Sequence, residues 1–166
     1  MKGDEDSLLV RLGRAYIGAR RLDDAVGTFA LLLGPQMQGC RQGVASMEYC
    51  ADAQHYIGFV NMQKGNFNGA APFLKDSMAS YARAAAGSDR VEYQMIKLKQ
   101  QAETETLLAA ALLRIGRKGP AVDALNHAIA QLGMIERNSE IQDAIRDSAK
   151  KSLQDAQSAL QLMLKN

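Results

Sequence analysis

The sequence lacks most of the features that mark enzymes, membrane proteins and β-sheet proteins. It has no tryptophan, three prolines, two cysteines and two histidines in 166 residues, and aromatic residues make up only 5%. It has no apolar run near the roughly 18 residues that a membrane-spanning helix needs. No segment alternates apolar and polar residues over the length of a strand. These absences exclude direct insertion into a membrane and argue against a β-sheet fold.

Charge of one sign is not in excess either. The chain has 20 basic and 18 acidic residues, so we expect no nucleic-acid partner. The densest basic cluster comprises Arg114, Arg117 and Lys118. It lies beside the predicted end of a helix, where cations offset the negative end of the helix dipole. The cluster therefore has a structural explanation.

Residues that could carry catalysis are scarce. The sequence contains no phosphate-binding glycine loop, no nucleophile elbow and no zinc-protease motif. Cys50 and His55 are five residues apart and do not share a helix face well. We expect His127 to form a surface ion pair with Asp123, four residues before it. We therefore predict that the protein is not an enzyme and holds neither a metal ion nor a cofactor.

The two cysteines fit no metal or redox motif. Cys40 and Cys50 are ten residues apart, unlike a Cys-x-x-Cys pair. In a cytosolic helical protein, such cysteines are most often reduced packing residues, and a disulfide between them stays open as the alternative. The segment after Met1 is polar and acidic, unlike a secretory signal. We predict a cytoplasmic protein on this basis.

Apolar residues and residues that favour helices are abundant, and the apolar fraction is 47%. Apolar spacing and breakers predict seven helices, over about residues 5–19, 23–33, 44–63, 66–86, 89–115, 119–132 and 139–164, with a loop at 36–43. Gly65, Gly116 and Gly133 are predicted to end three of them. Ser139 and Gln142 match a capping box at the start of the last helix, which we interpret as a closing helix.

Two helices carry more specific expectations. In the first, the apolar face that we expect to pack comprises Leu8, Leu9, Leu12, Ala15 and Tyr16. In the fourth, Pro72 lies inside the apolar pattern. That helix either begins near Gly69, with Pro72 in its first turn, or is kinked at the proline.

One pattern occurs three times. A small residue is followed twelve positions later by an alanine, and a large residue comes four positions after that alanine. The copies are Gly13, Ala25 and Phe29; Gly58, Ala70 and Leu74; and Ala109, Ala121 and Leu125. Small residues at fixed points let two helices approach closely, and large neighbours lock them together. The pattern therefore predicts stacked helical hairpins.

Together with their neighbours, these residues resemble the tetratricopeptide repeat, a 34-residue helix-turn-helix unit. The residues that carry the resemblance are Leu12, Gly13, Tyr16, Ala25 and Phe29; Ile57, Gly58, Gly65, Phe67 and Ala70; and Leu108, Ala109, Gly116, Ala121, Leu125 and Ala128. The three units span about residues 6–39, 51–84 and 102–135, further apart than the family's usual spacing, so one uniform superhelix is not expected. The alternative is an ordinary helical bundle.

The resemblance implies an all-α fold. We expect a tetratricopeptide-like α–α superhelix of about seven antiparallel helices, closed by a C-terminal capping helix at about 139–164. We also expect a single domain over residues 1–166. In that family, the first helix of each hairpin lines a concave groove.

The candidate groove residues follow from the family's positions and from helix geometry. They are Arg14, Ile17, Asp52, His55, Phe59, Met62, Gln63, Glu103, Thr106 and Arg114. Within each helix, their spacings place them on one face, independently of the family. Phe59 and Met62 would serve as apolar anchors for a partner, with packing in the interior as the alternative.

Two functions follow as hypotheses. The first is an adaptor that binds a peptide or a helix of a partner protein in the groove. The second is a self-assembling structural scaffold, in which homo-oligomers form through the helical repeats or through a seam on the helix at about 89–115. The sequence leaves open the partner, the pathway, the oligomeric state, the redox state of the cysteines and whether the chain is part of a longer protein.

Overall fold

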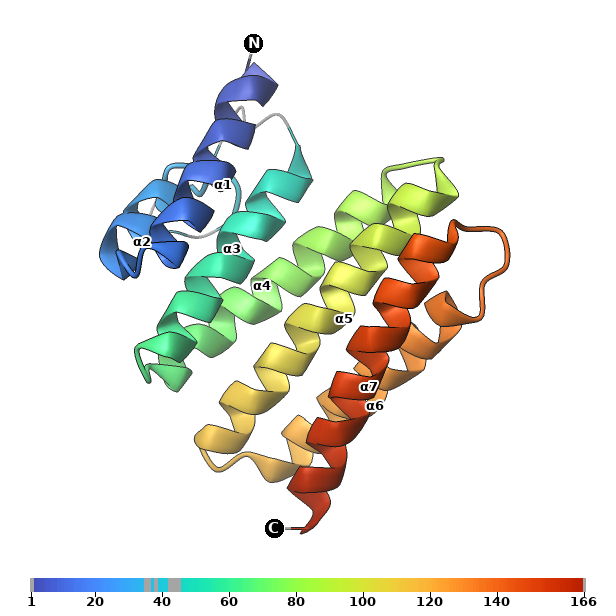
Figure 1. The fold of residues 1–166 in the computed structure, drawn as a ribbon. Helices are drawn as coiled ribbons and strands as arrows, with labels where there is room; N and C mark the ends of the chain where they lie inside the picture. The colour runs from blue at the N-terminus through green and yellow to red at the C-terminus, as the bar shows by residue number, and fades with distance from the viewer. Residues whose placement is uncertain (1, 35–36, 38, 42–45, 166) are drawn as a thin grey trace. The chain divides into compact units, whose positions relative to one another are not determined.

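The computed structural model describes residues 2–34, 37, 39–41 and 46–165, which contain seven α-helices (Figure 1). The helices are α1 (Lys2–Gly18), α2 (Leu22–Ala30), α3 (Met47–Gln63), α4 (Phe67–Ala86), α5 (Val91–Arg114), α6 (Lys118–Glu136) and α7 (Asp143–Lys165). The only bridge outside helices among the described residues joins Leu33 to Cys40. The all-α prediction is confirmed, and the superhelical arrangement stays a prediction.

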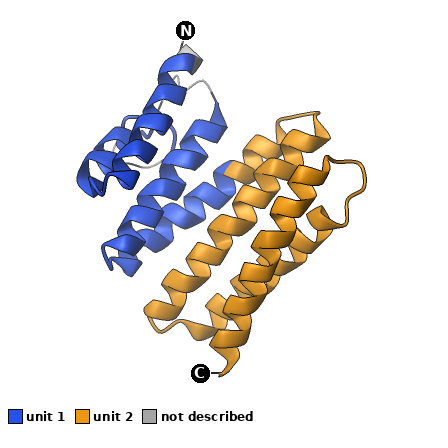
Figure 2. Ribbon diagram, viewed as in Figure 1, with its two compact units in different colours: residues 1–80 blue, residues 81–166 orange. Residues whose placement is uncertain are grey.

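The chain divides into two compact units, residues 1–80 and 81–166 (Figure 2). In unit 1, α1, α2 and α3 pack on one another, and the first part of α4 packs on α3. In unit 2, α5, α6 and α7 pack on one another. The expectation of a single domain over the whole chain stays a prediction.

Unit 1 contains two close helix contacts at glycine. A Cβ atom at Gly13 of α1 would lie 2.5 Å from the Cζ of Phe29 on α2, and Phe29 is fully buried. A Cβ atom at Gly58 of α3 would lie 2.7 Å from the Cγ of Leu74 on α4. Only glycine leaves room for these two side chains, so the small and large members of the pattern meet as predicted.

The third copy of the pattern packs in unit 2. Ala109 of α5 and Ala121 of α6 are fully buried, and Leu125 is almost fully buried. Each of the three hairpins thus brings its small residue and its large residue into the interior. The hairpin interpretation of the pattern is confirmed for α1–α2, α3–α4 and α5–α6.

The predicted helix ends are partly correct. Gly65 and Gly116 follow α3 and α5 with φ of 74° and 78°, the left-handed conformation in which glycine ends helices. Gly133 does not end α6, which continues to Glu136 because Ile135 is still fully buried in the packed unit. α2 ends at Ala30, before the predicted limit, and a turn follows.

One predicted helix start is wrong, and for α4 the start at about residue 66 is correct whereas the alternative start near Gly69 is wrong. Ser139 does not cap α7, because the helix begins at Asp143, where the Gln142 carbonyl accepts from the Arg146 N–H. α4 begins at Phe67, before Gly69, because the Asn66 side chain accepts a hydrogen bond from the Gly69 N–H at 3.0 Å. Pro72 therefore lies inside the helix, beyond its first turn.

Helix α1 packs through a different face from the one predicted. Val10 and Gly13 are buried against unit 1, and Leu9 and Tyr16 are partly buried. Leu8, Leu12 and Ala15 are exposed. The contact between Gly13 and Phe29 fixes which face of the helix is buried, and it leaves three of the five residues of the predicted apolar face exposed.

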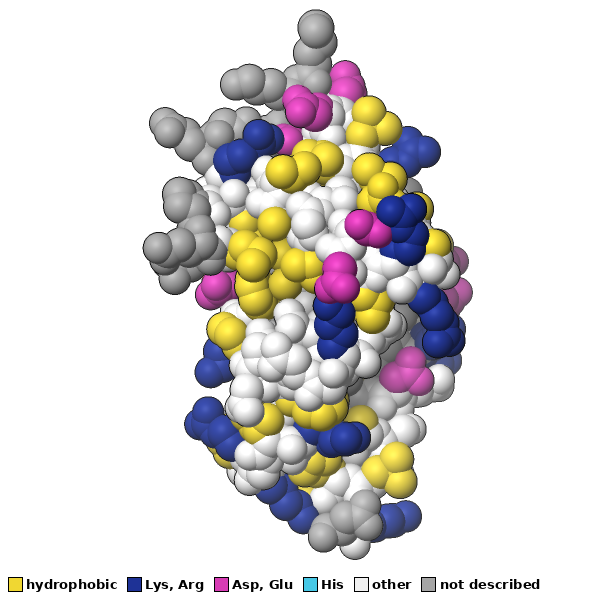
Figure 3. Space-filling view, turned by 90° about the vertical axis from the view of Figure 1, so that its left-hand side faces the viewer, with side chains coloured by type: hydrophobic (Ala, Val, Ile, Leu, Met, Phe, Trp, Pro, Cys, Tyr) yellow, Lys and Arg dark blue, Asp and Glu magenta, His cyan; other side chains and the backbone are white. Residues whose placement is uncertain are grey.

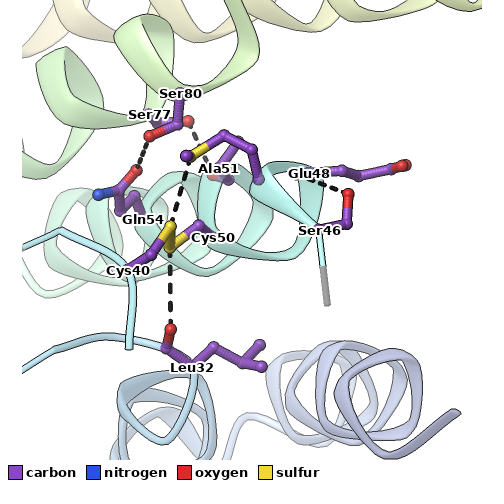
Figure 4. Close-up of a disulfide and its surroundings, with 10 residues drawn as sticks. Leu32, Cys40, Ser46, Glu48, Cys50, Ala51, Gln54, Ser77 and Ser80 are labelled. Atoms are coloured by element: carbon purple, nitrogen blue, oxygen red, sulfur yellow. Dashed lines mark hydrogen bonds between the residues drawn. A yellow bond between two sulfur atoms is a disulfide. The ribbon is translucent and has the colours of Figure 1, made fainter. Parts of the chain in front are cut away.

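Cys40 and Cys50 form a disulfide (Figure 4), so the expectation of reduced cysteines is wrong. The chain folds back after α2, where the Arg41 N–H donates to the Leu32 carbonyl at 3.1 Å, and this brings Cys40 to Cys50 at the start of α3. Disulfides are typical of oxidising compartments. The bond therefore argues against the cytoplasmic location, which stays a prediction.

Two buried serines join α4 to α3 (Figure 4). The Ser77 hydroxyl donates to the Ala51 carbonyl, and the Ser80 hydroxyl donates to the Gln54 Oε1, both at 2.8 Å. Because buried polar groups are costly without partners, these bonds fix the position of α4 along α3.

We expect Gly13→Ala to lower the free energy of unfolding by about 1–3 kcal/mol, because the added methyl group displaces the Phe29 ring from a full core. Gly27→Ala is the matched control. It lies in α2 with open space around its Cα, and it should raise the free energy of unfolding by up to about 1 kcal/mol. Urea unfolding measures both, and a Gly13→Ala chain as stable as the wild type would contradict the prediction.

Removal of the disulfide should lower the free energy of unfolding by about 2–3 kcal/mol, because the unfolded chain regains the freedom of a ten-residue loop. Cys40→Ala tests this without changing the buried Cys50. Reductant should lower the free energy of unfolding of the wild type to that of Cys40→Ala, and it should leave that of Cys40→Ala unchanged. Two alkylatable thiols in wild type that is unfolded without reductant would show that the bond is absent.

Candidate binding surface

Two candidate groove residues of unit 1, Arg14 and His55, lie beside a side chain that the sequence did not single out. The Tyr56 ring stacks on Phe29 and meets His55 edge-on, each with ring centroids 5.1 Å apart. The Arg14 guanidinium lies 5.8 Å from the centre of the same ring. Tyr56 therefore links Arg14 of α1 to His55 of α3, and cation–π attraction stabilises the pair.

The other candidate residues of unit 1 lie on the same helices. Phe59 and Met62 are half-buried, so neither is a full core residue nor a fully exposed anchor. Asp52 is also half-buried. Ile17 and Gln63 come together at one end of α1 and α3. There they line a hollow of about 410 Å³ with Gly18, Arg20 and Leu22.

In unit 2, Glu103 of α5 faces α7. Its carboxylate accepts from Lys99 at 2.7 Å, and the Ser152 hydroxyl of α7 donates to the same oxygen. α7 therefore lies over the face of α5 that the sequence predicts as groove, and Glu103 is not an exposed groove edge. Arg114 is exposed at the C-terminal end of α5.

Further along this face, the three helices of unit 2 leave an apolar pocket of about 440 Å³. Thr106 is the one candidate groove residue that lines it. The lining comprises Thr106, Leu107, Ala110 and Leu113 of α5, Lys118 and Leu125 of α6, and Ala159, Leu162 and Met163 of α7. A volume of this size is within the range of ligand pockets.

The contribution of α7 to the pocket was not predicted from the sequence. The narrow seam of α7, with Ala149, Ala156 and Met163 buried, is spaced at seven residues and identifies the packed face. Leu162 lies beside that seam and is 63% exposed, whereas Leu164 is 62% exposed and does not line the pocket. The available sequence signal was the excess of leucine near the C-terminal end of α7, a helix whose surface is otherwise polar.

The candidate residues thus fall into two sets, one in each unit. In unit 1, Arg14 and His55 lie beside Tyr56, and Ile17 and Gln63 line the hollow. In unit 2, Thr106 lines the apolar pocket. Each set has a surface of its own. The single groove across all three hairpins stays a prediction.

A buried carboxylate pairs with a histidine between α5 and α6. The Glu105 Oε2 lies 2.6 Å from the Nδ1 of His127, so the predicted pair of His127 with Asp123 is wrong. Burial raises the pKa of the Glu105 carboxyl, and the hydrogen bond and charge of His127 partly offset that rise. Glu105 points toward α6, whereas Glu103 points toward α7. The pair of Glu105 and His127 therefore has a structural role.

The arrangement offers surfaces for binding. Within the ranges that the structure describes, no cluster of three or more His, Cys, Asp or Glu side chains could hold a metal ion. Cys50 is in the disulfide, and His55 packs on Tyr56. The chemistry on these surfaces is apolar contact, charge and aromatic packing.

Comparison with protein-family models, with curated proteins and with solved structures found no match to this chain. The resemblance to the tetratricopeptide repeat rests on the sequence pattern and stays a prediction. Of the helices in the described segments, none is long and apolar enough to cross a membrane.

We expect the free energy of unfolding of Glu105→Gln to increase relative to that of the wild type as pH rises from 4 to 7. The folded-state pKa of Glu105 is raised, so its carboxyl contributes most to stability below its ordinary pKa and loses that contribution as pH rises through the raised value. Urea unfolding at several pH values measures the difference. Glu140→Gln, at an exposed site, is the baseline. A pH-independent difference for Glu105→Gln would contradict the prediction.

Proposed function

We propose that this protein is an interaction module that binds a peptide or a helix of a partner polypeptide. The observation that carries the proposal is the apolar pocket of unit 2, on the α5 face predicted to bind. Its wall combines Leu113 and Leu162, both exposed, with buried Leu125 and Met163. A pocket of this kind accepts one or two large apolar side chains of a partner, which then act as anchors.

The surface of unit 1 supports the same function. Tyr56 and Phe59 present aromatic area on α3, and Arg14 adds a positive charge beside it. Aromatic and arginine side chains contribute most of the binding energy at many protein interfaces. In this proposal, binding depends on surfaces that are already formed, and no covalent bond is made or broken.

Self-assembly is the second candidate function. The exposed stripe of Leu8, Leu12 and Ala15 on α1 favours it, because apolar side chains on one helix face are typical of a contact surface. The seam that the sequence predicts on α5 is a less suitable contact. Three of its residues, Ala102, Leu108 and Leu112, are buried.

Affinity capture with the intact chain tests the interaction module. We expect a polypeptide that the wild type retains to be retained about tenfold less by Leu113→Gln/Leu162→Gln, because the apolar wall is lost. Leu164→Gln is the matched control, since it removes an equally exposed leucine of α7 outside the pocket. Equal retention by the double variant and the control would show that the pocket does not bind the partner.

A further inference from the structure

We infer that the pocket of unit 2 binds helix α1 of a second copy of this chain, so that copies associate head to tail. The inference rests on the proposed function, because it assigns an occupant to the same pocket. Two surfaces support the inference. One is an apolar stripe with carboxylates on α1, and the other is an apolar pocket with cations in unit 2. We call them the donor face and the acceptor pocket.

The donor face is an apolar stripe that unit 1 does not cover. Leu8 is 60% exposed and Leu12 is 45% exposed, and Ala15 is exposed one turn further on. Spacings of four and three residues place these side chains on one face of the helix. The opposite face of α1 packs on unit 1, so the helix is apolar on two sides.

Carboxylates lie at the N-terminal end of the donor face. Asp4 and Glu5 are exposed in the first turn of α1. Glu5 is three residues before Leu8, so its carboxylate lies on the same face, about 4.5 Å before the leucine along the axis. Figure 3 shows acidic and apolar side chains next to one another at the top of the face that it presents.

The acceptor pocket has the complementary chemistry. Its walls are apolar, and Lys118 is the one charged side chain that lines it. Residues 106–122 and 156–165, which include eight of the nine lining residues, contain no carboxylate and four cations, Arg114, Arg117, Lys118 and Lys165. The ninth lining residue, Leu125, lies two residues after Asp123. The first turn of α6 has no acidic residue either. Leucines of the donor face thus match the wall, and Glu5 matches Lys118.

A second copy fits because one chain carries both surfaces. The donor face and the acceptor pocket are different, so the contact is heterologous and builds rings or open chains. Two leucines and one ion pair make a small interface. We therefore expect association at high micromolar concentration that weakens on dilution and in salt.

Sedimentation velocity with paired variants tests the inference. Leu8→Gln/Leu12→Gln lacks the donor face, and Leu162→Gln lacks a wall of the acceptor pocket. Each variant alone should stay at the monomer mass of 18.0 kDa under conditions in which the wild type associates. Their equimolar mixture should form a one-to-one complex, because each variant keeps the surface that the other lacks.

Two matched controls remove exposed leucines outside the proposed contact. Leu31→Gln in unit 1 and Leu164→Gln in unit 2 should associate like the wild type. Charge reversal is an independent test of the same contact. Glu5→Lys and Lys118→Glu should each weaken association, and both changes in one chain should restore it. All of these side chains are exposed, and circular dichroism checks that every variant is folded.

Three results would overturn the inference: a wild type that is monomeric at high micromolar concentration, a mixture that forms no complex, or controls that weaken association as much as the test variants. If partner capture still depends on Leu162, only the occupant is wrong and the proposed function stands. If capture is also insensitive to Leu162, the proposed function fails together with the inference.

Discussion

The close approach of paired helices at small residues is the constraint on which this structure depends. At Gly13 and Gly58, a single added methyl group would overlap a buried side chain of the facing helix. Protein interiors are packed too densely to absorb such an overlap, so each hairpin has one register in which its large residue fits. That register decides which face of α1 or α3 turns inward, and therefore which residues remain outside to bind.

Much of the fold was predictable, because helices and hairpins depend on local spacing. The seven helices and the ends at Gly65 and Gly116 follow from apolar period and from glycine's access to positive φ. Gly133 and Ser139 misled for one reason. Both are local signals. Burial of Ile135 extended α6 past Gly133 to Glu136, and α7 begins at Asp143, after Ser139. The end of a helix therefore depends on tertiary packing as well as on local sequence signals.

The candidate surfaces were less predictable, because they depend on partners distant in the sequence. Arg14 and His55 both lie beside the Tyr56 ring, and helical spacing could not show that Tyr56 would join them. Glu105 pairs with His127 across 22 residues, and Cys40 reaches Cys50 only because the chain folds back after α2. On the α5 face that carries the candidate residues, α7 lies over Glu103 and lines the pocket beside Thr106.

The cations around the pocket limit which occupants the proposed binding surface could accept. Apolar area alone discriminates little, as Leu162 and Leu164 illustrate, since they are equally exposed but only one lines the pocket. Lys118 is exposed beside this apolar wall, so its ammonium stays in contact with water and repels other cations. A basic amphipathic helix would therefore be disfavoured, whereas a helix with a carboxylate beside its leucines would be attracted. In the association that we propose, Glu5 of α1 supplies that carboxylate.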